Sequence, residues 1–399
     1  MKIPSPREIL LGPWRAVPVL GVTQILAWGA LFYPPVLTVP LIAADRGWSL
    51  AFAMGGFSCG LLTAGLVAPT VGRMIDRHGG HVVMTAGSLA GSAGLLALVH
   101  AAQPVTYLAA WALIGAAMAA SLYDPAFATL GRIFGAAARR PITVLTFMGG
   151  LASTVSWPAT HVLLGRSDWR GTYLVYAALL ALVAAPLHAL ALPRSRADPD
   201  ARPQGPNAPA PPVHLPARGL PFVLVVAGFA AYAFVPSGLS AHLLAIFGRS
   251  GIDPATVVAI GALFGPSQVT ARLCEFVFAG NAHPLNLARS AFSLIVGAFA
   301  LLALAGISAP IAAAFAIMFG LSNGLVTIAR GTVPLALFGP AGYGRLIGRI
   351  AGPWLAMQAA APLVMAFVAE RLSDAAALGL ACTFAIVALA CFVALRRPA

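Results

Sequence analysis

The chain has 399 residues, of which 60% are hydrophobic and only 9% are charged, and its mean hydropathy is +0.89. Soluble domains carry about 25% charged residues, so this composition excludes an ordinary soluble protein and indicates a chain that crosses a membrane many times. The net charge of +13 does not indicate nucleic-acid binding, because the basic residues are scattered between hydrophobic runs. These runs are unbroken rather than alternating, as residues 50–71 show, so we predict an all-α polytopic fold.

Taken in chain order, the hydrophobic runs predict twelve membrane spans. A proline-rich stretch of charged and small residues, 193–219, separates the sixth span from the seventh and cannot form a helix. We therefore predict an N-terminal six-helix bundle over 1–192, a linker over 193–219 and a C-terminal six-helix bundle over 220–399. The predicted spans are 14–43, 50–72, 81–101, 104–130, 142–164, 172–192, 220–247, 254–274, 287–306, 308–338, 349–368 and 374–396.

The distribution of basic residues predicts the orientation of the spans. When the N-terminus and every second loop are assigned to the cytoplasm, most of the 24 Lys and Arg residues fall on that side. Both termini are then cytoplasmic. The first hydrophobic run begins at Trp14 and is too long for a signal-peptide core, so we interpret it as an uncleaved span. We expect an integral protein of a bacterial inner membrane.

A short charged turn, residues 72–81, lies between the second and third spans and has a counterpart in the second half. The first turn contains Arg73 and Asp76, and the second contains Arg272 and Glu275 after the eighth span. Matching features in two halves are typical of transporters, in which the substrate site lies between the repeats near the middle of the bilayer. We therefore expect two pseudo-symmetric bundles around a central cavity.

The turn resembles the loop motif of the major facilitator superfamily (MFS), Gly-x-x-x-Asp-Arg/Lys-x-Gly followed by basic residues. Gly72, Asp76, Arg77 and Gly79 match it, whereas Gly80-His81 stands where basic residues are usual. Together with the twelve spans and the central linker, the resemblance covers essentially the whole chain. It implies that the turn and its counterpart latch the cytoplasmic side closed in the outward-open state. The latch residues would be Gly72, Arg73, Asp76, Arg77, Gly79, Arg132 after the fourth span, Arg272 and Glu275.

Shorter patches resemble the monocarboxylate and oxalate/formate branch of that superfamily. They are Gly47-Trp48-Ser49 after the first span and Arg139-Arg140 before the fifth. Drug/proton antiporters of the superfamily typically carry Gly-Pro-Gly-Gly in the fifth span, where this chain reads 149–153 as Gly-Gly-Leu-Ala-Ser. This difference weakens an assignment to drug efflux without excluding it.

Ionisable residues inside spans are costly and usually face a cavity or one another. Asp124 in the fourth span and Arg330 in the tenth occupy matching positions, so they could meet across the cavity as a proton-titrating acid and an anion contact. A static salt bridge near the ends of the spans is the alternative. His161 and His242 could relay protons, or they could be hydrogen-bonded packing residues.

Other polar and aromatic side chains in the spans are candidates for contact with a substrate. Those of the first span form an amide and aromatic surface that is interrupted by Pro34-Pro35, and by resemblance this span lines the cavity. The cavity candidates are Gln24, Trp28, Phe32, Tyr33, Tyr123, Trp157, Asn323, Arg330 and Gln358.

No metal-ligand cluster, phosphate-binding loop or catalytic triad is evident, so we expect no cofactor, no metal and no enzymatic activity. The favoured function is secondary active transport of a small organic molecule, with a mild preference for an anionic or amphipathic one. We expect alternating access, coupling to protons and a monomer in the lipid bilayer, with the direction of transport open. Proton-driven efflux of a toxic compound is one alternative, and a non-transporting membrane sensor of the same fold is another.

Overall fold

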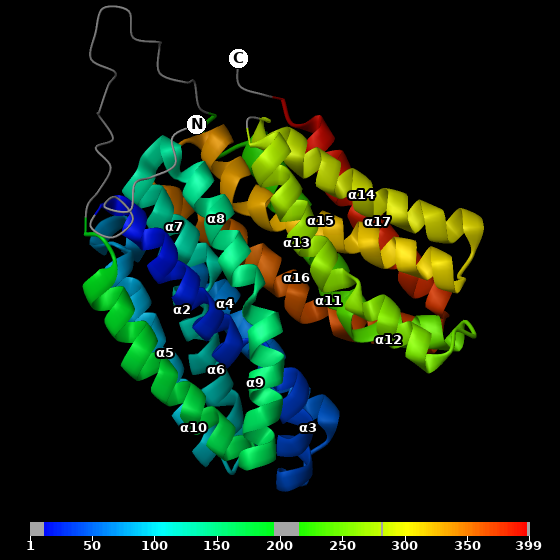
Figure 1. The fold of residues 1–399 in the computed structure, drawn as a ribbon, viewed down its shortest axis with the longest axis horizontal. Helices are drawn as coiled ribbons and strands as arrows, with labels where there is room; N and C mark the ends of the chain where they lie inside the picture. Colours follow the sequence, from blue (N-terminus) through cyan, green and yellow to red (C-terminus); the bar gives the residue numbers. More distant parts are fainter. Residues whose placement is uncertain (1–11, 195–214, 281, 397–399) are drawn as a thin grey trace, which may run out of the picture. The chain divides into compact units, whose positions relative to one another are not determined.

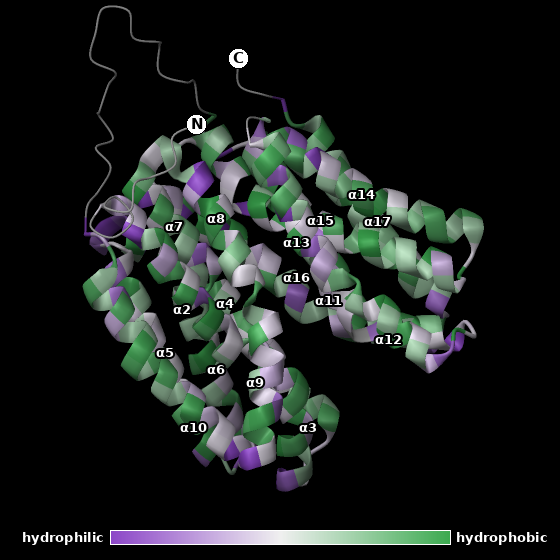
Figure 2. Cartoon of the chain, in the orientation of Figure 1, coloured by the Kyte–Doolittle hydropathy of each residue, from purple (hydrophilic) through white to green (hydrophobic). Residues whose placement is uncertain are grey.

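A computed structural model describes residues 12–194, 215–280 and 282–396, and every regular element within these ranges is a helix (Figure 1). This confirms the prediction of an all-α polytopic fold. Eleven helical stretches of the described residues are long and apolar enough to cross a membrane. The longest of them, Pro104–Arg166, contains the predicted fourth and fifth spans. Hydrophobic residues cover the lengths of the helices, and hydrophilic residues gather mostly near the ends (Figure 2).

Residues 12–194 hold α2 to α10 and four short helical elements. Their bounds are η1 Pro13–Arg15, α2 Ala16–Leu31, α3 Pro35–Arg46, α4 Leu50–His78, α5 Gly80–His100, α6 Pro104–Ser121, α7 Tyr123–Phe134, η2 Gly135–Ala138, α8 Arg139–Gly150, α9 Ala152–Arg166, α10 Trp169–Leu179, η3 Leu180–Ala184 and η4 Leu187–Ala191. After residue 214 the elements are α11 Leu220–Arg249, α12 Pro254–Ala262, α13 Phe264–Cys274, η5 Glu275–Ala279, α14 Pro284–Ala305, α15 Ala309–Phe338, α16 Tyr343–Arg371 and α17 Asp374–Ala394.

Several predicted spans are interrupted, and proline explains the break in the fourth. α6 ends at Ser121, Leu122 is extended, and α7 begins at Tyr123. Pro125 has no N–H, so the helical bond to the carbonyl of Ser121 cannot form. Gln24 of α2 replaces it, because its Nε2 donates to that carbonyl at 2.7 Å. A buried carbonyl that the sequence leaves open is therefore satisfied by a side chain from the first span.

The chain divides into two compact units. Unit 1 comprises residues 1–212 and 340–352, and unit 2 comprises 213–339 and 353–399. The start of α16 therefore groups with unit 1 and its remainder with unit 2. The predicted boundaries of the two bundles stay a prediction, and residues 195–214 of the predicted linker lie outside the described part of the chain.

Glycines let the helices of unit 1 approach closely. A Cβ added to Gly115 of α6 would overlap the backbone of Gly60 in α4, and one added to Gly87 of α5 would lie 2.7 Å from the Cβ of Ala120 in α6. A Cβ added to Gly91, one turn after Gly87, would lie 3.2–3.4 Å from side chains of Leu180, Ala117 and Leu31, which belong to three different helices. Since helices in a membrane associate through packing rather than through the hydrophobic effect, small residues at such contacts stabilise the bundle.

Each unit also contains a bidentate ion pair between two of its membrane helices. In unit 1, Arg170 at the start of α10 donates to both carboxylate oxygens of Asp45 at the end of α3, at 3.2 and 2.7 Å. In unit 2, Arg249 at the end of α11 donates to Asp374 at the start of α17, at 2.7 and 2.6 Å. Both pairs join residues 125 apart in the sequence. The two units thus repeat one contact with the acid and the base exchanged.

Candidate functional site

The charged turn 72–81 is held by the start of α16. Asp76 lies near the end of α4, and its Oδ1 and Oδ2 accept the backbone N–H groups of Gly344 at 2.9 Å and Arg345 at 2.7 Å. The first N–H groups of a helix have no partner within the helix and carry the positive end of its dipole. The Asp76 carboxylate therefore caps α16 from a residue that is 268 positions away in the sequence.

Glycines allow the backbones of α4 and α16 to touch beside this cap. A Cβ added to Gly72 would overlap the backbone oxygen of Gly344, and one added to Gly348 would overlap that of Ala68. The ring of Tyr343, which is fully buried, packs against Gly131 of α7, and a Cβ added to Gly131 would overlap it. We call this contact, Ala68–Asp76 with Tyr343–Gly348, the α4–α16 seam.

The other residues of the turn shape its end. Arg132 of α7 donates to the backbone carbonyls of Asp76 and of Ile75, the latter at 3.2 Å, so it bonds to the end of α4 itself. Gly79 has φ +89°, a conformation that favours glycine. The departure from the MFS motif has a steric reason, because a Cβ on Gly80 would overlap the side chain of Thr129. Arg73 and Arg77, the remaining latch candidates here, are exposed.

The counterpart of the turn in the second half has a different environment. Arg272 of α13 and Glu275 of η5 are both buried. Arg272 donates to Oε1 of Gln268 at 3.4 Å, and the same oxygen accepts Nδ2 of Asn323 at 3.0 Å. This part of unit 2 is therefore a partly buried polar network that connects α13 to α15.

The aromatic and amide candidates of unit 1 gather around Trp28. Its indole Nε1 donates to Oε1 of Gln24 at 3.0 Å, and Gln24 is fully buried. Gln24 thus donates to the open carbonyl at the break in the fourth span and also orients Trp28. The ring of Trp28 lies 4.8–5.9 Å from three others, and Tyr33 extends the cluster to Trp157 at 6.0 Å. The candidates that the structure brings together here are Gln24, Trp28, Phe32, Tyr33, Tyr123 and Trp157.

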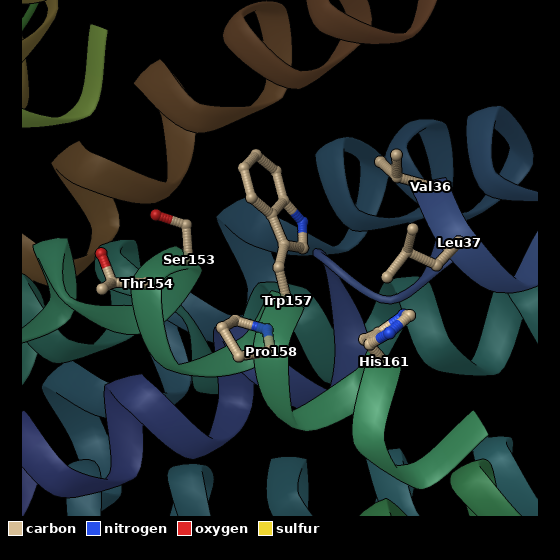
Figure 3. Close-up of a pocket in the computed structure, with 7 residues that line it drawn as sticks. All are labelled: Val36, Leu37, Ser153, Thr154, Trp157, Pro158 and His161. Atoms are coloured by element: carbon tan, nitrogen blue, oxygen red, sulfur yellow. The ribbon is translucent and has the colours of Figure 1, made fainter. Parts of the chain in front are cut away.

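Trp157 also lines a pocket of about 660 Å³ in unit 1 (Figure 3). One wall is α9, and the other is the start of α3. The pocket is within the size range of sites for small organic ligands. Its lining residues are Val36, Leu37, Ser153, Thr154, Trp157, Pro158 and His161.

In unit 2, Arg330 is held by an aromatic face. It is 8% exposed, and its guanidinium carbon lies 4.3 Å from the ring centroid of Trp354. The ring of Tyr232 is stacked with that of Trp354, with 6.3 Å between the centroids, and its hydroxyl donates to Oδ1 of Asn323 at 3.3 Å. A guanidinium placed over a ring is oriented without losing its positive charge. Arg330 and Asn323 therefore belong to one polar and aromatic cluster of α11, α15 and α16.

The sequence profile of the Major Facilitator Superfamily matches residues 20–313. The chain belongs to the major facilitator superfamily. The resemblance noted in the sequence is thereby confirmed, and the family and fold are those of membrane transporters that bind small molecules. No curated protein sequence matches the chain.

Solved MFS structures share the whole fold at low sequence identity. The human organic anion transporter MFSD10 is 17% identical, with a TM-score of 0.71 over 98% of this chain and 99% of that one. The proton:xylose symporter XylE, bound to 6-bromo-6-deoxy-D-glucose, is 11% identical, with a TM-score of 0.71 over 96% of this chain and 95% of that one. These likenesses show the fold alone.

Three further MFS site candidates are Asp124, His242 and Gln358. Asp124 is half-buried in the first turn of α7 in unit 1, whereas Arg330 belongs to unit 2, so their pairing stays a prediction. Nδ1 of His242 lies 3.1 Å from the carbonyl of Gly238 on its own helix. The carbonyl of Gln358 in α16 accepts Oγ of Ser237 at 2.7 Å. Among the described residues, no group of three His, Cys, Asp or Glu could hold a metal ion.

Sequence reasoning missed a buried histidine and the partners of Arg330. His188 in η4 is fully buried, with Nδ1 3.1 Å from Oγ of Ser88 and Nε2 2.8 Å from Oγ1 of Thr23. It connects three helices of unit 1, yet its neighbours in the sequence are apolar and give no signal. Trp354, whose ring lies beside Arg330, and Tyr232, which stacks on Trp354, are not marked by any pattern in the sequence around Arg330.

Proposed function

We propose that this protein is a secondary active transporter that moves a small organic molecule by alternating access and is coupled to protons. The observation that carries the proposal is the cap that Asp76 forms on α16. α4 belongs to the predicted N-terminal bundle and α16 to the predicted C-terminal bundle, so the α4–α16 seam joins the two. Alternating access requires such a contact to form in one state and break in another.

The chemistry of the seam suits a contact that opens and closes. Hydrogen bonds to a charged group contribute about 1.5–3 kcal/mol each, and Asp76 accepts two of them. This is enough to bias an equilibrium without locking it. At Gly72, Gly344 and Gly348 the two helices meet through backbone atoms, so few side chains interlock across this part of the seam. With the predicted orientation of the termini, the seam closes the cytoplasmic side.

The expected substrate class is an organic anion or an amphipathic molecule. Arg330 supports it, because a buried guanidinium that is fixed by Trp354 supplies a positive charge within a span. Asp124 is the proposed proton carrier, being half-buried beside the break in the fourth span. Organic anion transport and proton symport both occur on this fold, in MFSD10 and XylE respectively. The direction of transport stays open.

The test is a pH-jump assay on proteoliposomes that contain the purified protein and an internal pH dye. A panel of small organic acids and amphipathic drugs is added outside. We expect one compound class to trigger proton movement, and Asp76→Asn to impair it while leaving insertion intact. Glu370→Gln is the matched control, because it removes an exposed carboxylate at the other end of α16. If no compound of the panel triggers proton movement through the wild-type protein, proton-coupled transport of these compounds is refuted.

A further inference from the structure

Helix α9 has a buried polar face whose hydrogen bonds are all made within unit 1. Oγ of Ser156 donates to the carbonyl of Gly29 at 2.9 Å. The hydroxyl of Thr160 lies 2.6 Å from that of Tyr176. Ser156 and Thr160 are both buried, so this face fastens α9 to α2 and α10.

A second polar face of the same helix has no such partners. It carries Ser153, Thr154, Trp157 and His161, and three of these four residues are exposed, Trp157 by 48%. Within the described part of the chain, their hydroxyl, indole and imidazole groups form no hydrogen bond with the protein. The four residues recur at the helical spacing of 3.6 residues per turn, which places them on one side of α9.

A third face of α9 is apolar and exposed. Leu151, Val155 and Val162 are each about half exposed and share that side of the helix. α9 lies within the membrane-crossing stretch Pro104–Arg166. Polar groups that face hydrocarbon without a partner are costly, so the apolar face suits lipid and the second polar face suits water or a ligand.

This second polar face is the wall of the pocket described above. In Figure 3 the ring of Trp157 stands between Ser153 and Thr154 on one side and Val36 and Leu37 on the other, and His161 lies below Leu37. The surface of the pocket is almost entirely apolar, and Ser153 and Thr154 lie on one side of the Trp157 ring while His161 lies on the other. Among the residues that line it, none is acidic and one, His161, has an imidazole that can donate to an anion.

We propose that this pocket binds an amphipathic organic anion, with its apolar body between Trp157 and Leu37 and its carboxylate on the imidazole of His161. The assignment rests on the proposed transport function and places its proposed substrate class at a binding site in unit 1. The hydroxyls of Ser153 and Thr154 bind further polar groups of the ligand. A soluble aromatic acid and a membrane fatty acid share this chemistry, and the experiment distinguishes them.

The first measurement tests whether the second polar face of α9 is accessible to water. Single cysteines replace Thr154, His161, Leu151 or Val155 in a chain whose native cysteines Cys59, Cys274, Cys382 and Cys391 are changed to alanine. A membrane-impermeant anionic thiosulfonate is applied to spheroplasts and to inverted vesicles. We expect Thr154→Cys and His161→Cys to react at least about ten times faster than Leu151→Cys and Val155→Cys. Equal rates on the two faces would overturn the proposal.

The second measurement tests the ligand class by calorimetry on the purified full-length protein. The probes are 4-phenylbutyrate, its amide, the corresponding amine, and laurate. We expect the acid to bind at least about tenfold tighter than the amide. His161→Ala should remove that preference, Trp157→Ala should weaken the acid and the amide alike, and Val155→Ala is the control on the apolar face. Binding of laurate without phenylbutyrate would identify the source as a membrane fatty acid.

Preference for the amine, absence of acid binding to the wild type at millimolar concentration, or unchanged binding in both pocket variants would overturn the proposal. The pH-jump assay separates this failure from that of the transport function. If a compound moves protons equally through the wild type and Trp157→Ala, transport stands and the pocket assignment fails. If the acid binds at His161 but no compound moves protons, the pocket stands and the transport function fails.

Discussion

Removing the charge of Asp76 should open the α4–α16 seam by an amount that follows from its contacts. In Asp76→Asn one oxygen acceptor remains, so one of the two hydrogen bonds to Gly344 and Arg345 and the attraction to the helix terminus are lost. These losses amount to about 2–4 kcal/mol, which shifts the ratio of closed to open seam by roughly 30- to 700-fold. The physical reason is that the amide carries no charge to stabilise the unpaired N–H groups of α16.

The opening can be measured through Leu346, which lies in the first turn of α16 and is only 4% exposed. In the cysteine-free chain with Leu346→Cys, the rate of maleimide labelling reports the fraction of time that the seam is open. Asp76→Asn should raise this rate by the factor above, up to the rate of a fully open seam. Glu370→Gln should leave it unchanged. A labelling rate in Asp76→Asn equal to that with Asp76 would refute the assignment of the cap as the latch.

Three further predictions concern other contacts. Gly348→Leu should raise the maleimide labelling rate of Leu346→Cys, because the leucine side chain would overlap α4. Gly379→Ala is the control and should leave that rate unchanged, because nothing lies within 4 Å of an added Cβ. An unchanged rate in Gly348→Leu would contradict the backbone contact. Asp45→Arg and Arg170→Asp should each lower the melting temperature, because each removes an ion pair that contributes about 0.5–1 kcal/mol to stability. The double variant Asp45→Arg/Arg170→Asp should restore the melting temperature if the two residues pair directly. Asp124→Asn should change the pH dependence of transport in proteoliposomes, and an unchanged profile would leave Asp124 a structural residue.

The sequence by itself determined the class of fold. A chain with 9% charged residues and runs of about 20 apolar ones can satisfy its backbone in a bilayer only as helices, and the structure and the family profile confirm this. The sequence predicted one continuous fourth span over 104–130, whereas the structure shows a break after Ser121, where Pro125 lacks the backbone donor.

Only the tertiary structure decided the partners. Asp76 bonds to backbone N–H groups, which every residue except proline carries, so no side chain in the sequence marks α16 as its partner. Helical spacing separates the three faces of α9, but two of them are polar, and burial alone distinguishes the fastened face from the one in the pocket. His188 and Arg330 likewise have partners on other helices, at separations in the sequence that no local pattern encodes. Contacts between distant helices depend on which backbones approach closely, and that is decided by the packing of the whole bundle.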